Sequence, residues 1–211
     1  VGNMRGSFDR ELQRLETEII RMGSRANGWR LLRGNHEDFV LDCADPLRSR
    51  PGPGYETTRF AHFALAQSAH HYHLLAALPD VFERAAPNGE LLRIVHASMR
   101  NNRDGIYPFT TDDDLRRQIA PAPSVFVTGH THRPLMRHVD GALVVNIGSV
   151  GASFDEDRRA AYGRFRWDGH WAAELVRLDY DYTQIERDFV ESGFLAEGGP
   201  LAQIMLVELR K

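Results

Sequence analysis

Two histidines, His130 and His132, lie one residue apart in the stretch GHTHRP at residues 129–134. Imidazole nitrogens are among the commonest protein ligands of first-row transition metals. If the local backbone is extended, side chains at positions i and i+2 point the same way, so both rings would face one site. A pair of solvated loop histidines is the alternative, and partners elsewhere in the chain decide between these interpretations.

Three further segments carry residue types that bind metals or phosphate, each directly after a short apolar run. These residues are Asn35 and His36, then His96, then Asn146 and Ser149. Amide oxygen and imidazole nitrogen suit Mn, Fe, Zn or Ni. Loops at the carboxyl ends of strands gather at one edge of an α/β sheet. The sequence therefore predicts that these side chains line a single cleft.

The apolar runs are rich in β-branched residues and end in polar segments with glycine, which is typical of buried strands. They cover residues 29–32, 91–95, 124–127 and 142–145. Helical patterns lie between them over 8–22, 55–78 and 112–119, the last with an acidic start that suits a helix N-terminus. The alternation predicts a layered α/β fold in which β-sheets are flanked by helices.

We expect residues 1–211 to form a single domain. The breaker cluster RSRPGPG at 48–54 marks the 55–78 helix as an insertion. The segment 160–211 reads as a C-terminal hairpin, with strands over 161–167 and 171–180 around Asp168-Gly169, followed by closing helical or edge segments over 184–192 and 201–209. The apolar residues of 199–209 either pack on the core or pair with a second copy, which leaves a homo-oligomer open.

Composition limits the classes of partner. The 211 residues include 26 basic and 29 acidic side chains, a formal charge of -3, so no global basic surface favours nucleic acid or an anionic membrane. A single cysteine, Cys43, excludes an internal disulfide. No apolar run is long enough to span a bilayer and no signal pattern opens the chain, so a cytoplasmic protein is expected.

Four motifs in order, GNHE at 34–37, the strand-end His96, GHTH at 129–132 and NIGSVG at 146–151, together resemble the calcineurin-like metallophosphoesterases, in particular their small bacterial and archaeal phosphodiesterase-like members. The likeness runs from residue 1 to about residue 181. It implies hydrolysis of phosphomono- or phosphodiesters, with small-molecule phosphate esters as substrates, by a hydroxide that two divalent metal ions activate. By matching position, the ligands of the second metal would be Asn35, His96 and His130, and His132 would bind the first.

The resemblance also gives His36 a catalytic role, in which it protonates the leaving oxygen or stabilises the phosphoryl group. Two arginines near the site, Arg100 and Arg133, are candidates for substrate binding, because a guanidinium can hold phosphate bidentately. The competing interpretation is that Arg100 is a solvated loop residue and that Arg133 pairs with an acidic side chain. Asn146, Ser149 or carbonyls of the 146–151 loop would orient the imidazoles, and this loop is expected to be a structural turn rather than a source of ligands.

One part of the family pattern is missing at the front. The family begins with a strand bearing Asp-x-His and continues to a Gly-Asp whose aspartate bridges the metals, whereas Val1 reads as the position just after that pair. We therefore expect the fold to lack its first strand-helix-strand segment. The alternative to an enzyme is a non-catalytic or single-metal scaffold that retains the fold. A nuclease is disfavoured by the lack of a basic stripe.

Overall fold

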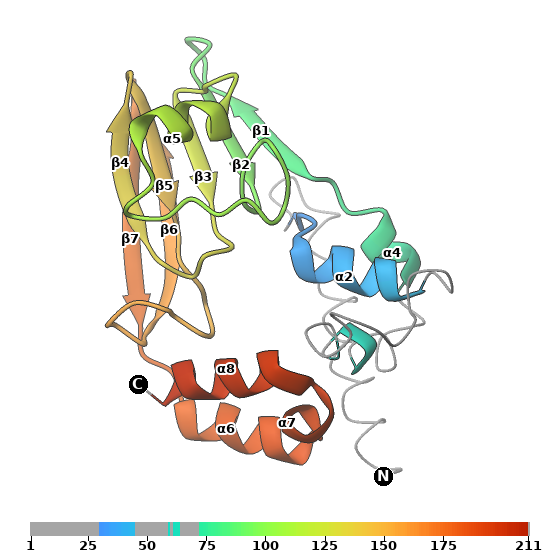
Figure 1. Cartoon of the computed structure of the whole chain (residues 1–211). Helices are drawn as coiled ribbons and strands as arrows, with labels where there is room; N and C mark the ends of the chain where they lie inside the picture. The colour runs from blue at the N-terminus through green and yellow to red at the C-terminus, as the bar shows by residue number, and fades with distance from the viewer. Residues whose placement is uncertain (1–29, 45–58, 60, 64–71, 211) are drawn as a thin grey trace.

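The computed structural model describes residues 30–44, 59, 61–63 and 72–210, and Figure 1 traces the chain. Its central element is a five-stranded sheet in the order β1-β2-β3-β5-β4. The inner strands β2, β3 and β5 are parallel, whereas β1 and β4 run antiparallel at the two edges. The strands are β1 Val81–Ala85, β2 Leu91–Val95, β3 Val125–Thr128, β4 Leu135–Val139 and β5 Ala142–Asn146.

Other elements cover both faces of this sheet. Helix α5 lies on one face, and the two-stranded antiparallel sheet β6-β7 packs on the other (Figure 1). Helices α6, α7 and α8 follow β7 and lie below the sheets in this view, and α2 and α4 lie beyond β1. The bounds are α2 Asn35–Ala44, α4 Tyr72–Ala76, α5 Asp112–Ile119, β6 Ala160–Trp167, β7 Trp171–Leu178, α6 Tyr182–Glu191, α7 Phe194–Glu197 and α8 Gly199–Leu209.

Alternate side chains of β3 build the core on both sides of the sheet. Phe126 is fully buried in a cluster with Leu115 of α5. Val125 and Val127 belong to a second cluster, which includes Phe165 of β6. Because both faces of β3 are covered, its first three residues are all apolar instead of alternating with polar ones. The layered α/β architecture predicted from the sequence is thus confirmed.

Most predicted elements that fall in the described residues are confirmed. The runs 91–95, 124–127 and 142–145 form β2, β3 and β5, and residues 112–119 form α5 with Thr111 as its N-cap, whose side chain accepts from the Asp114 backbone N–H. The hairpin around Asp168-Gly169 is β6-β7, with Trp167 opposite Trp171. The closing segments are the helices α6 and α8 rather than edge strands.

The predicted strand over 29–32 is wrong for its described part. Residues 30–34 form neither strand nor helix, and Leu31 is 44% exposed. Between this stretch and distant residues that the structure describes, the one backbone bond is from the Arg33 N–H to the Pro79 carbonyl (2.9 Å). A strand needs a ladder partner to satisfy its backbone groups and a covered face to bury its side chains, and neither exists here among the described residues.

Three other predicted features lie partly or wholly outside the described residues. The 8–22 helix and the RSRPGPG cluster lie outside them, and of the 55–78 helix only Arg59, residues 61–63 and 72–76 are described as helical. None of the described helices is long and apolar enough to cross a membrane. In α8, Ala202, Leu206 and Leu209 are buried, whereas Ile204 and Val207 are exposed. Association through this segment, like a cytoplasmic location, stays a prediction.

Candidate metal centre

The parallel pairing of β2 with β3 brings two of the predicted site segments together. In this ladder Leu92 lies opposite Val125 and Ile94 opposite Val127. Both strands end at the same edge, and the pairing continues one step further, because the Gly129 N–H donates to the His96 carbonyl (2.9 Å). His96 and the GHTH stretch therefore start side by side, as the sequence predicted from strand-end position alone.

Three side chains meet at this edge. His96 Nε2 lies 2.7 Å from Asn35 Oδ1 and 3.2 Å from His130 Nδ1, and His130 Nδ1 lies 3.3 Å from Asn35 Oδ1. The rings of His96 and His130 meet edge to face, with centroids 5.1 Å apart. These are the three residues that the resemblance assigned to the second metal, and they come from three separate segments of the chain.

The first turn of α2 fixes Asn35. Gly34 is the N-cap: its carbonyl accepts from the Asp38 N–H (3.1 Å), and its own N–H donates to the Glu37 side chain (2.7 Å). A glutamate that reaches back from the third helical position to the N-cap N–H is half of a capping box. Gly34 has a second function here, because a Cβ at this position would lie 2.8 Å from His96 Nδ1. Only glycine lets the helix start this close to the imidazole.

The backbone of the GHTH stretch differs from the extended conformation that the sequence suggested. His130 and His132 have φ values of 63° and 56°, in the left-handed region, whereas Gly129 does not. The Thr131 N–H donates to the Gly129 carbonyl (2.7 Å), so His130 is the central residue of a γ-turn of the rare positive-φ form. The two histidines therefore adopt the unusual backbone themselves, and Gly129 does not.

Asn146 holds this strained turn from the end of β5. Its side chain is fully buried, and Nδ2 donates to the Gly129 carbonyl (2.7 Å) and to Thr131 Oγ1 (2.9 Å), the residues on either side of His130. Its Oδ1 accepts from the Gly148 N–H (2.9 Å). The amide thus offsets the cost of the positive φ angles, which is on the order of 1–3 kcal/mol for each residue. The prediction that this loop shapes the site is supported by these contacts.

His132 is oriented from another segment. Its Nδ1 lies 2.6 Å from the Ala152 carbonyl oxygen. Because a carbonyl can only accept, Nδ1 carries the proton and Nε2 keeps its lone pair for a ligand. The Phe154 ring packs on the imidazole, with centroids 4.9 Å apart. The orienting group is therefore Ala152, one residue beyond the 146–151 loop that the sequence predicted.

Burial lowers the pKa of all four histidines around the centre. For His96 the pKa falls to about 4, first because burial penalises the charged imidazolium and then because His130 lies alongside. For His36, His130 and His132 the pKa is also lowered, with burial as the largest cause in each case. Interactions between His132 and both His36 and His96 place all four rings in one neighbourhood. The rings are neutral at pH 7, the form that binds metals.

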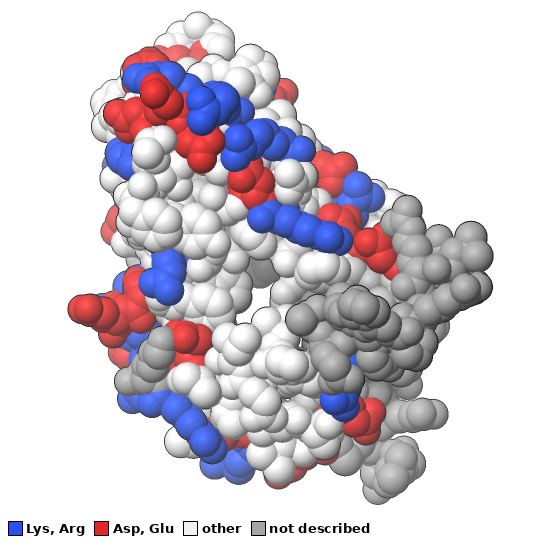
Figure 2. Space-filling view, in the orientation of Figure 1, with Lys and Arg blue, Asp and Glu red and all other residues white. Residues whose placement is uncertain are grey.

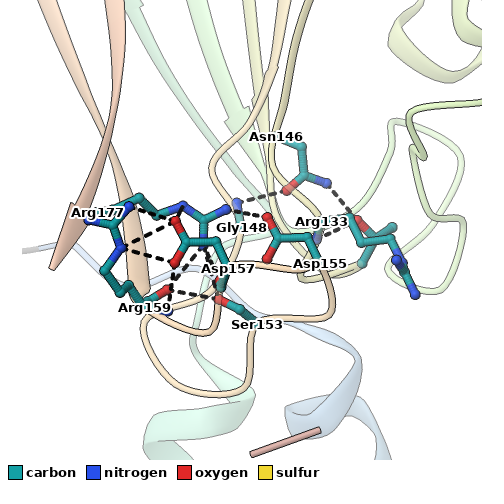
Figure 3. Close-up of polar contacts among 9 residues, drawn as sticks. Arg133, Asn146, Gly148, Ser153, Asp155, Asp157, Arg159 and Arg177 are labelled. Atoms are coloured by element: carbon teal, nitrogen blue, oxygen red, sulfur yellow. Dashed lines mark hydrogen bonds and ion pairs between the residues drawn. The ribbon is translucent and has the colours of Figure 1, made fainter. Parts of the chain in front are cut away.

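The two candidate substrate-binding arginines differ. Arg100 makes a bidentate pair with Asp104, at 2.5 Å from Nε and 2.7 Å from Nη2, and its Nη1 donates to Asp114 (3.2 Å). Its guanidinium would have to leave both carboxylates to hold phosphate, so these contacts favour a loop-anchoring role. The Arg133 guanidinium makes no ion pair within the part of the chain that the structure describes, and Figure 3 shows it pointing away from Asp155.

The geometry of the three converging donors fits one metal ion. Two donors bonded to one ion at about 2.1 Å in an octahedral arrangement lie about 3.0 Å apart. The separations here, 2.7, 3.2 and 3.3 Å, bracket that value. Over the described residues no group of three His, Cys, Asp or Glu side chains is arranged to hold a metal. A metal ion bound at this position would therefore need the amide oxygen of Asn35 as its third donor.

Fold and site together define a layered α/β protein with an imidazole and amide cluster at the carboxyl edge of its parallel strands. A family model, the calcineurin-like phosphoesterase superfamily domain, matches residues 12–168, so the chain belongs to this family. The family is one of hydrolases that usually bind divalent metals. The family resemblance stated from GNHE and GHTH is thus confirmed.

Solved structures agree with the fold. A hypothetical protein from Pyrococcus horikoshii OT3 superposes with a TM-score of 0.64 at 16% identity, over 89% of this chain and 75% of that chain. A metallophosphoesterase from Sphaerobacter thermophilus gives 0.62 at 20% identity, over 85% and 75%. At these identities the likeness concerns the fold alone. Comparison with curated proteins gave no significant match.

Proposed function

We propose that the chain is a metal-dependent phosphoesterase in which Asn35, His96 and His130 hold one divalent cation. The convergence of their three donor atoms within 3.3 Å of one another carries this proposal. When bound, divalent ions supply Lewis acidity that polarises the phosphoryl group and activates water as the nucleophile. Nitrogen and amide oxygen donors accept Mn, Fe, Zn or Ni, and the proposal does not choose among them.

His132 is the proposed ligand for the other divalent ion, the one that the family resemblance numbers first. Its Nδ1 is committed to the Ala152 carbonyl, so Nε2 is the available donor. The contact with Phe154 limits rotation of the ring. The chain's own contribution at this position is therefore a fixed imidazole in a single tautomer, which favours ligation because little rotational freedom is lost on binding.

His36, the second residue of α2, is the proposed catalytic residue. Because desolvation lowers its pKa, His36 is neutral at pH 7, and a neutral imidazole carries one N–H. A hydrogen bond from that N–H would stabilise the charge that develops on the leaving or phosphoryl oxygen. Of the two roles that the resemblance allowed, hydrogen-bond donation therefore fits better than full protonation of the leaving group.

The proposed substrates are small-molecule phosphate esters, and the Arg133 guanidinium is proposed to bind their phosphate group. On the face seen in Figure 2, basic side chains lie beside acidic ones rather than in a continuous stripe. Arg116, for example, is paired with Asp113 and Asp140. Paired charges of this kind attract a polyanionic nucleic acid weakly, which supports a small substrate.

The test uses Asn35→Ala and His96→Ala, with His138→Ala as the matched control because His138 is an exposed histidine of β4. Chelator-treated protein is titrated with Mn and Zn by calorimetry, and hydrolysis of p-nitrophenyl phosphate and bis-p-nitrophenyl phosphate is followed with each ion. We expect tight metal binding and ion-dependent hydrolysis for the parent chain and the control, and a loss of both in the other two variants.

The competing interpretation is a scaffold in which the same contacts are hydrogen bonds. A protonated His96 Nε2 would donate to Asn35 Oδ1 at the observed 2.7 Å. In that case no divalent ion stimulates hydrolysis, and Asn35→Ala lowers the free energy of unfolding without changing metal content. This result would reject the enzyme proposal and leave the scaffold.

A further inference from the structure

The segment between β5 and β6 determines where His132 lies. Residues 147–159 contain neither helix nor strand. Three contacts connect this segment to His132: the Ala152 carbonyl with Nδ1 (2.6 Å), the Phe154 N–H with the His132 carbonyl (3.0 Å), and the Phe154 ring with the imidazole. The position of the imidazole therefore depends on residues 152–154, which have no ladder or helix bonds of their own.

One side chain from the other sheet supplies much of the missing support. Arg177 of β7 donates from Nη1 to the carbonyls of Asp157 (2.7 Å) and Arg159 (3.1 Å) and to Ser153 Oγ (3.4 Å). Its Nη2 pairs with the carboxylate of Asp155. Figure 3 shows the guanidinium surrounded by these groups. The Arg177 side chain is only 17% exposed, so the contacts are largely shielded from water.

The surrounding contacts keep the partners of Arg177 in place. Ser153 Oγ donates to the Arg159 carbonyl (3.0 Å), and Arg159 Nη2 donates to the Asp157 carboxylate (2.7 Å). This hydrogen bond is the largest reason why the pKa of Asp157 falls to about 2, so the carboxylate is ionised at neutral pH. At the start of the segment, the Tyr180 hydroxyl donates to the Gly151 carbonyl. Both β7 and the residues after it therefore hold the segment.

We infer that Arg177 is a positioning residue for His132, acting through the segment 152–157 that it clamps against β7. The inference rests on the proposed function only in that His132 is taken as a metal ligand. Arg177 lies beyond residue 168, where the match to the family model ends. Without the guanidinium, the carbonyls of Asp157 and Arg159 lose a donor and Asp155 loses its counter-charge. The Ala152 carbonyl then no longer stays within hydrogen-bond distance of the imidazole.

The test measures the tautomer of His132 in metal-free protein from the ¹⁵N chemical shifts of the histidine ring nitrogens. In the parent chain the shifts of His132 should report one tautomer with the proton on Nδ1. In Arg177→Gln they should move toward a mixture of the two tautomers, whereas the shifts of His96 and His130 stay unchanged. Arg177→Lys, which keeps the charge but not the planar fork, should retain more of the parent tautomer than Arg177→Gln.

The matched control is Arg164→Gln. Arg164 lies on β6 of the same two-stranded sheet and also pairs with a carboxylate, Glu174 (2.8 Å), but its side chain is 61% exposed. The control should leave the His132 shifts unchanged. Unchanged His132 shifts in Arg177→Gln would overturn the inference, and so would equal changes in Arg164→Gln, because the cause would then be general weakening of the hairpin.

If Arg177→Gln does not fold, Asp155→Asn replaces it, since this change weakens the clamp at one point. The same shift of the His132 tautomer is expected, and its absence in a folded variant would overturn the inference. Metal titration of the folded variant should show affinity weakened by about 10- to 100-fold. Because the tautomer is measured without metal or substrate, a chain that binds no metal but shows the tautomer shift would reject the proposed function alone.

Discussion

Gly34 offers the sharpest test of how the site is packed. A Cβ at this position would lie 2.8 Å from His96 Nδ1, 2.9 Å from Cε1 and 3.0 Å from the Glu37 carboxylate. Ordinary contacts between such atoms begin at roughly 3.4 Å, so the imidazole has to move by about 0.6 Å in Gly34→Ala. Overpacking of this size costs about 1–3 kcal/mol. It also moves Nε2, which lies 2.7 Å from Asn35 Oδ1.

We expect Gly34→Ala to lower the free energy of unfolding in urea by about 1–3 kcal/mol and to weaken metal binding in calorimetry by roughly 10-fold or more. Gly34→Ser separates the clash from the cap, because serine is a good N-cap but carries the same Cβ. Gly129→Ala is the control: its Cβ would find its nearest neighbours at 3.8 Å. Parent-like metal binding in Gly34→Ala, or equal losses in Gly129→Ala, would refute this account of the packing.

Three further predictions concern the site. His36→Ala should lower turnover by roughly 10²-fold with metal content unchanged, because the ring donates to the substrate and not to the metal; equal loss of both quantities would make His36 structural. Asn146→Ala removes a buried amide with four hydrogen bonds and should cost about 2–4 kcal/mol in urea unfolding; a cost below 1 kcal/mol would contradict its bracing role. The pKa of His96 lies near 4 when folded, so the unfolded chain binds more protons between about pH 6.5 and pH 4. The unfolding free energy of metal-free protein should therefore fall as the pH drops through this window, and His96→Gln should flatten the slope; a slope that His96→Gln leaves intact would assign it to other groups.

The local sequence pattern was sufficient to predict the inner strands and the proximity of His96 and His130. Strands β2 and β3 are covered on at least one face along their length, so their apolar runs are visible in the sequence, and their parallel pairing follows from α/β alternation. Once these strands are neighbours, His96 and His130 must lie at the same edge. Strands β1 and β4 were not predicted, because they are edge strands with several exposed positions and charged residues such as Glu83 and Arg137.

Turn signals would have revealed both edge strands. Asp140 and Gly141 have φ values of 47° and 85° and join β4 to β5 in a two-residue hairpin turn, for which Asp-Gly is a preferred sequence. Gly89, with φ of 88°, stands at the β1-β2 connection. The residues that support the site could not be predicted in this way. The contacts of Asn146 and Arg177 depend on the path of irregular loops, which no local periodicity encodes.

The left-handed backbone at His130 and His132 changes what mutagenesis of this stretch can measure. Alanine removes the imidazole but keeps a Cβ in an unfavourable conformation, so its effect combines lost ligation with a steric penalty that the native contacts no longer offset. Glycine abolishes ligation equally and relieves the penalty. We expect His130→Gly to have a free energy of unfolding about 1 kcal/mol higher than that of His130→Ala. This difference measures the conformational strain of the GHTH stretch.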